Sequence, residues 1–155
     1  MPNNEKVERV APWSPRYLQL QVYLDEVAAR QTVDRLVATA REALNAHYET
    51  ELGEPFRTAG LCLYRDGSDS VAWHGDTIGR GKSEDTMVAI VSLGSRRHFL
   101  LRPRGGGTTI KHALGHGDLI VMGGSCQRTW EHAIPKTVRS VGPRISVQFR
   151  PSGVR

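Results

Sequence analysis

The sequence is poor in cysteine and contains no long apolar run. Its two cysteines, Cys62 and Cys126, are too few for a disulfide framework and lie among apolar neighbours. No stretch approaches the roughly 18 apolar residues of a membrane-spanning helix. The first 13 residues lack the apolar core of a secretory signal. We therefore expect a cytoplasmic protein in a reducing compartment, with no contact to a membrane.

Internal repeats and low-complexity stretches are also absent. The 155 residues fit one domain of ordinary size, and the 39% of hydrophobic residues suffice for a core. We expect a loose polar tail over residues 1–24 and one folded domain over residues 25–155.

The positive charge is concentrated in one segment. The net charge of the chain is +5. The segment 80–111 contains two acids, Glu84 and Asp85, and seven bases: Arg80, Lys82, Arg96, Arg97, Arg102, Arg104 and Lys111. It therefore holds the whole excess of the protein. Such a segment favours a polyanionic partner such as nucleic acid, and the alternative is a solvated basic loop.

The apolar pattern changes near residue 60. Before it, apolar residues recur at helical spacing over about 26–48, which predicts one amphipathic helix or a broken pair, with Asp25 as an N-cap and Gly53 and Pro55 at the end. Leu18–Leu24 alternates like a strand, or leads into the helix. After it, about eight short apolar or β-branched runs alternate with turn signals. This pattern predicts a mainly β protein with an N-terminal helix, in which a double-stranded β-helix (jelly roll) is buttressed by one or two helices.

His74-Gly75-Asp76 is the first motif that carries chemistry. In a strand, side chains two residues apart point to the same face, so the imidazole and the carboxylate converge. A second histidine would complete the two-His-one-carboxylate set of non-haem iron(II) oxygenases. The candidates downstream are His98, His112, His116 and His132. We favour His132, because it follows a strand and tight turn and lies among apolar neighbours.

The last apolar run, Arg144–Arg150, alternates two kinds of side chain. One face of the expected strand carries Arg144, Ser146, Gln148 and Arg150, and the other carries Ile145, Val147 and Phe149. Two guanidinium groups on one face invite a carboxylate, which arginine binds through two parallel hydrogen bonds. The alternative is an edge strand with a polar outer face.

These motifs together resemble the AlkB family of dioxygenases over about residues 43–150, more than two thirds of the chain. The HxD motif, the distant histidine and the RxxxxxR spacing appear in the order of that family. The segments that carry the resemblance are Leu63–Asp76, Val91–Gly94, His98–Arg102, Gly117–Gly124, Trp130–His132 and Arg144–Arg150.

The resemblance implies a set of site residues. His74, Asp76 and His132 would ligate iron(II), and Tyr64 and Arg144 would bind the distal carboxylate of 2-oxoglutarate, with Ser146 and Arg150 beside them. Dioxygen would be the other cosubstrate. Trp130, Arg96 and Arg97 are the expected substrate-binding residues, with a place in the core as the alternative for Trp130. By its place between Ala72 and His74, Trp73 should face away from the metal and pack in the core.

Three departures from the family pattern bear on function. Cys62 stands where the family usually has an asparagine two residues before the tyrosine, and a thiol is a weak substitute for an amide. Family members that repair nucleic acid carry a substrate lid before the helix, whereas residues 1–24 leave room only for a short remnant. Ile78, two positions after Asp76, replaces an often acidic residue.

The expected function is oxidative demethylation of alkylated nucleobases in DNA or RNA, that is, alkylation damage repair. The substrate would be a single strand or a flipped base, and the protein a monomer. Two alternatives stay open. The same chemistry could act on a protein side chain or a small molecule, or the chain could be a lid-truncated relative with weak or no turnover.

Overall fold

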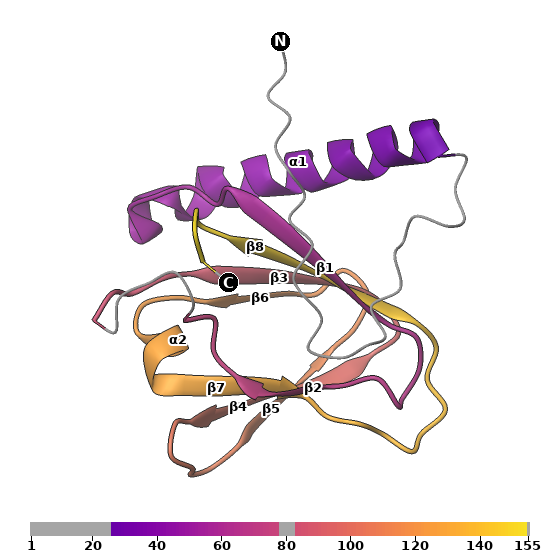
Figure 1. Cartoon of the computed structure of the whole chain (residues 1–155), viewed down its shortest axis with the longest axis vertical. Helices are drawn as coiled ribbons and strands as arrows, with labels where there is room; N and C mark the ends of the chain where they lie inside the picture. The colour runs from indigo at the N-terminus through magenta and orange to yellow at the C-terminus, as the bar shows by residue number, and fades with distance from the viewer. Residues whose placement is uncertain (1–25, 78–82, 155) are drawn as a thin grey trace.

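A long helix covers one face of a sandwich of two four-stranded antiparallel sheets in the computed structural model (Figure 1). The structure describes residues 26–77 and 83–154. The expected tail over 1–24, the strand Leu18–Leu24, Asp25, Ile78, Arg80 and Lys82 lie outside the described residues. Among the described residues, no helix is both long and apolar enough to cross a membrane.

Helix α1 (Glu26–Leu52) confirms the helical spacing and continues four residues beyond the predicted end. Its residues Val37, Ala40, Leu44 and Tyr48 recur at intervals of three or four, so they form one apolar stripe. The helix ends at Gly53, which has a φ of 77° and whose amide donates a hydrogen bond to the Glu49 carbonyl (2.8 Å). These features form a left-handed C-terminal cap.

The eight apolar runs of the sequence correspond to the eight strands of the described residues. The larger sheet has the order β1 (Thr58–Tyr64), β8 (Arg144–Arg150), β3 (Val88–Gly94), β6 (Leu119–Met122). The smaller sheet has the order β2 (Val71–His74), β7 (Trp130–Ile134), β4 (Arg97–Pro103), β5 (Ile110–Leu114). Neighbours that are distant in sequence, such as β1 and β8, make this the predicted jelly roll.

Side chains along each strand of the larger sheet point alternately to its two faces, and both faces are buried. Ala89, Val147 and Phe149 point toward α1 and pack with Leu44 and Phe56. The residues between them in sequence point into the space between the two sheets, where Val88 and Ile90 pack with Phe99 of β4. Functional side chains on this second face are therefore enclosed by the smaller sheet.

Strand β8 lies in the middle of the larger sheet, between β1 and β3. The alternative of an edge strand with a polar outer face is therefore wrong. Arg144, Ser146 and Arg150 are buried, and they lie on the face that looks into the sandwich. Burying two guanidinium groups in this way is costly unless they meet anions or acceptors, which makes this face the place to look for a site.

A short helix, α2 (Cys126–Thr129), joins β6 to β7. The apolar pattern does not indicate this helix, since four residues between Gly123-Gly124 and a strand are too few to show helical periodicity. It lies at one end of the smaller sheet, beside the segment that follows β2 (Figure 1).

Candidate metal centre

The two sheet histidines are brought together by strand pairing. His74 ends β2 and His132 lies in β7, and the two are direct partners in the antiparallel register. Their ring centroids are 4.1 Å apart. The His132 ring also stacks on Phe99, at 5.3 Å and 17° between planes, so its orientation is fixed by packing.

Asp76 reaches the same point from outside the sheet. We predicted that His74 and Asp76 share one strand, but β2 ends at His74, so this part of the prediction is wrong. Instead, the Thr77 amide donates to the Gly75 carbonyl (2.9 Å), which forms a three-residue turn centred on Asp76. The turn still directs the carboxylate toward the histidines.

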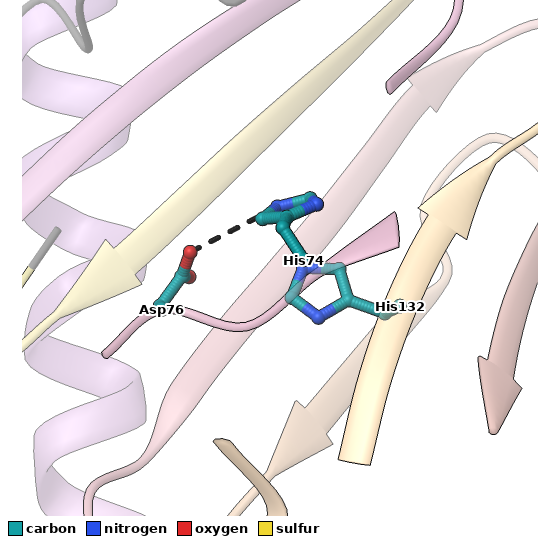
Figure 2. Close-up of side chains that lie close together, drawn as sticks. All are labelled: His74, Asp76 and His132. Carbon is teal, nitrogen blue, oxygen red and sulfur yellow. Dashed lines mark ion pairs between the residues drawn. The ribbon is translucent and has the colours of Figure 1, made fainter. Parts of the chain in front are cut away.

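The three side chains converge, as Figure 2 shows. One ligand atom from each of His74, Asp76 and His132 lies within 4.8 Å of the others. The Nε2 of His74 is 3.9 Å from Oδ1 of Asp76. In the part of the chain that the structure describes, this is the only such group of histidine, cysteine and carboxylate side chains. His98, His112 and His116 are exposed and lie apart from it.

The protonation of the group suits a cation. Burial and the neighbouring His74 lower the pKa of His132 to about 3, so its imidazole is neutral at physiological pH. Burial raises the pKa of Asp76, but the charge and hydrogen bond of Arg150, together with His132 and His74, outweigh burial and hold that pKa below its ordinary value. Nδ1 of His74 lies 2.8 Å from the Ala72 carbonyl, to which it donates as the N–H, leaving Nε2 as the ligand atom.

Arg150 contacts this group through Asp76. Its Nε donates to Oδ2 of Asp76 at 3.0 Å, and both side chains are buried. Its Nη2 donates to Oε1 of Gln148. Its guanidinium thus orients the carboxylate that faces the two histidines, and its place beside the cosubstrate stays a prediction.

Arg144 offers the free anion-binding groups. Its side chain is 1% exposed and its Nε donates to Oγ of Ser92 (2.8 Å), but Nη1 and Nη2 have no hydrogen-bond partner among the described residues. The Tyr64 ring lies 5.2 Å from the guanidinium carbon. Burial lowers the pKa of Arg144, and Tyr64 opposes that effect. Two buried, unpaired donors in a fork fit the two oxygens of a carboxylate.

Cys62 and Ser146 form the cross-strand row next to the one that pairs Tyr64 with Arg144. Cys62 is the register partner of Ser146, which is in turn the partner of Ser92 on β3. The amide of Gln148 approaches both Sγ of Cys62 and Oγ of Ser146 at 3.5 Å. The buried polar face of β8 therefore runs without interruption from Arg144 to Arg150.

The two tryptophans near the site lie on opposite faces of the smaller sheet. Trp130 is half-buried and is two residues from His132 on β7, so it shares the inner face. Trp73 faces away from the metal group, as predicted. It does not pack in the core, however: its half-buried ring lies 4.0 Å below the guanidinium carbon of Arg102, which is paired with Glu131.

The basic segment is divided between surface and interior. Arg96, Arg104 and Lys111 are exposed, whereas Arg97 is only 3% exposed. The Arg97 guanidinium donates to the carbonyls of Asp66, Asp69 and Pro135 at 2.7 to 2.8 Å. The prediction that Arg97 binds substrate is therefore wrong, because all its donors face inward and tie loops together.

This difference between two adjacent arginines gives a testable result. Arg97→Met should lower the free energy of unfolding by at least about 3 kcal/mol, because three charge-assisted hydrogen bonds are lost. Arg96→Met, at an exposed position, should change it by less than about 0.5 kcal/mol. Urea unfolding of both variants measures the difference, and equal values would contradict the inward role of Arg97.

The comparisons with known proteins agree with this geometry. The model of the 2OG-Fe(II) oxygenase superfamily matches residues 4–150. The chain is 34% identical over 119 residues to bovine alpha-ketoglutarate-dependent dioxygenase alkB homolog 3, covering 69% of this chain and 40% of that protein. It is 32% identical over 133 residues to DNA oxidative demethylase ALKBH2 of Arabidopsis thaliana, covering 71% and 42%. It thus spans about two fifths of these relatives.

A solved structure, OsALKBH1, shares the fold. It superposes with a TM-score of 0.56 at 19% sequence identity, over 78% of this chain and 63% of that chain. With the family match over nearly the whole sequence, the chain belongs to the 2OG-Fe(II) oxygenase superfamily and is an AlkB-like member of it.

Proposed function

We propose that the chain is an Fe(II)- and 2-oxoglutarate-dependent dioxygenase that removes alkyl groups from nucleobases. The observation that carries the proposal is the enclosure of two complementary groups between the same two sheets. One is the cluster of His74, Asp76 and His132, and the other is the unpaired guanidinium fork of Arg144.

The side chains present fit iron(II). Two neutral imidazoles and an ionised carboxylate are the donors of the non-haem iron(II) oxygenases, and they leave the other positions of the metal to cosubstrates. His74 and His132 would hold the ion through nitrogen and Asp76 through oxygen. Arg150 would keep Asp76 ionised and oriented, through the contact that it makes in the protein alone.

The side chains of β8 and β1 fit a 2-oxo acid with a distal carboxylate. Arg144 would bind that carboxylate through Nη1 and Nη2, with Tyr64 beside it. Ser146 and Cys62, which pair in the adjacent cross-strand row, would contact the same molecule. Because these groups are buried, they would exclude water from the cosubstrate.

With these components bound, iron supplies the oxidation of a C–H bond by dioxygen, coupled to loss of carbon dioxide from 2-oxoglutarate. One oxygen atom enters succinate and the other enters the alkyl carbon. For an N-methyl group the hydroxymethyl product releases formaldehyde and restores the N–H. The residues of this chain bind and orient the reactants, and they make no covalent bond to them.

Nucleic acid is the substrate that the charge and the relatives favour. The name of the Arabidopsis relative specifies DNA, and the exposed bases Arg96, Arg104 and Lys111 supply positive charge. Trp130, half-buried on the face of His132, is the candidate for contact with the base. A flat aromatic ring stacks on any base, which suits a single strand or a flipped nucleotide.

The deciding experiment measures succinate formation with iron(II), ascorbate and 2-oxoglutarate, with and without an N-methylated single-stranded oligonucleotide. Succinate with equimolar formaldehyde from the oligonucleotide supports the proposal. If the oligonucleotide does not increase the succinate yield, the substrate is instead a protein or a small molecule. No succinate under any condition would show a chain without turnover.

Replacing the buried thiol tests the cosubstrate row. Cys62→Asn should lower the apparent 2-oxoglutarate constant about two- to tenfold, because an amide donates a full hydrogen bond where a thiol donates a weak one. Cys62→Ala is the matched control and should raise it or leave it unchanged. Initial rates of succinate formation at varied 2-oxoglutarate measure the constants. A raised constant in Cys62→Asn would place the cosubstrate away from Cys62.

A further inference from the structure

The turn that carries Asp76 is held from outside the sheet. β2 stops pairing with β7 at the His74–His132 pair, so Asp76 is beyond the last strand partner. Its amide donates to Oε1 of Gln127 at 2.9 Å, and this bond is buried. A metal ligand outside regular structure needs such a contact if its carboxylate is to keep one position.

The Asp76 amide is the strongest hydrogen-bond partner of the Gln127 side chain. Its side chain is 1% exposed and comes from α2, which lies next to β7. Its Nε2 approaches Sδ of Met122 at 3.7 Å, and sulfur is a weak acceptor. The strong hydrogen bond of this buried amide is therefore the one to Asp76, because burying a primary amide without a good partner is unfavourable.

The backbone of Gln127 closes the other side of the turn. A Cβ on Gly75 would lie 2.7 Å from the Gln127 carbonyl and 2.4 Å from Nη2 of Arg104, so only glycine fits there without movement. The same Nη2 donates to that carbonyl at 3.0 Å, and the Arg104 amide donates to the Thr129 carbonyl at 2.8 Å. Hydrogen bonds and close packing around Gln127 thus hold the Asp76 turn against α2 and the end of β4.

We propose that Gln127 is a positioning residue of the metal centre: through its side-chain oxygen it fixes the Asp76 turn in the conformation that binds the ion. The inference rests on the proposed metal site and adds to it a residue that would touch neither iron nor cosubstrate. It also gives a reason for glycine between His74 and Asp76, since the turn must approach the α2 backbone closely.

The test compares two substitutions in one buried contact. Gln127→Met keeps the volume and removes the acceptor for the Asp76 amide. Met122→Leu removes the sulfur that Gln127 also contacts but leaves the Asp76 bond intact. Binding of Co²⁺ alone, followed by its visible absorption, should weaken about tenfold to a hundredfold in Gln127→Met. In Met122→Leu it should stay within about twofold of the original protein.

A loss of stability alone cannot produce this pattern, because the affinity is measured on protein shown to be folded by circular dichroism. Unchanged Co²⁺ affinity in folded Gln127→Met overturns the proposal. Hydrogen exchange of the Asp76 amide in the unsubstituted, metal-free protein decides the matter if the variant does not fold. Protection supports the contact, and exchange at the rate of an unstructured peptide overturns it. If the unsubstituted protein binds no Co²⁺, the metal site itself fails, and amide protection still reports on the contact separately.

Discussion

Substituting any one of His74, Asp76 or His132 by alanine is expected to abolish iron-dependent succinate formation. Each provides one of the three donor atoms that lie within 4.8 Å of one another, and within the described residues the structure offers no further histidine, cysteine or carboxylate to replace it. Two remaining donors would bind the ion too weakly to hold it at micromolar concentration. We expect turnover to fall by at least about a thousandfold, since the chemistry depends wholly on the metal.

The control is a histidine of the same chain that lies outside the cluster. His116 is exposed on the turn after β5, and its Nδ1 accepts the Gly94 amide at 3.0 Å. His116→Ala should keep both metal affinity and turnover within about twofold. Metal binding by calorimetry and succinate formation, measured on the four variants, separate the two kinds of histidine. Full turnover in His132→Ala would show that the ion binds elsewhere.

The three variants should differ in stability although they agree in activity. Asp76→Ala leaves the buried guanidinium of Arg150 with Gln148 as its only side-chain partner among the described residues, and a poorly paired buried charge is strongly unfavourable. His74→Ala removes a side chain that is partly exposed. Metal-free Asp76→Ala should therefore unfold at a lower temperature than His74→Ala, which thermal unfolding followed by circular dichroism will measure.

The strand pattern was predictable because both faces of these strands have a definite environment. In β8, apolar Ile145, Val147 and Phe149 alternate with polar residues, so the sequence alone predicts a strand with one apolar and one polar face. It could not show that the polar face is the inner one. That depends on the position of β8 between β1 and β3, which is a property of the topology and not of the local pattern.

The metal ligands were predictable in kind, and their local structure was not. The spacing of His74 and Asp76 suggested one strand, but the carboxylate comes from a turn whose stability depends on Gln127, 51 residues away. Contacts of that kind leave no periodic trace. The same holds for Arg96 and Arg97, which have the same chemistry and adjacent positions; only the three inward carbonyls distinguish them.

The burial of Arg144 links the fold to the proposed chemistry, because it lowers the stability of the ligand-free protein. Two of its donors are buried and lack hydrogen-bond partners among the described residues, and burying a charge without full pairing costs free energy. A ligand that supplies a carboxylate would remove that cost. A bound anion would therefore explain why a buried arginine stands at this position.

Arg144→Met should accordingly have opposite effects on stability and on binding. In the ligand-free protein, the free energy of unfolding should stay the same or rise, because methionine fills a similar space without a buried charge; the lost bond to Ser92 limits the gain. Affinity of the Mn²⁺-loaded protein for 2-oxoglutarate should fall at least about a hundredfold, since two charge-assisted hydrogen bonds are lost. Calorimetric titration measures the affinity, and urea unfolding the stability.

Thermal unfolding joins the two effects in one measurement. A ligand present at a hundred times its dissociation constant stabilises the folded state by about 2.7 kcal/mol. The unsubstituted Mn²⁺-loaded protein should therefore unfold at a clearly higher temperature with 2-oxoglutarate, and Arg144→Met should not respond to the same concentration. Arg144→Lys is the sharper variant, because it keeps the charge and loses the fork: if the fork is what binds, lysine should restore little of the shift. A full shift in Arg144→Lys would mean that charge alone suffices, and an undiminished shift in Arg144→Met would place the cosubstrate carboxylate at another residue.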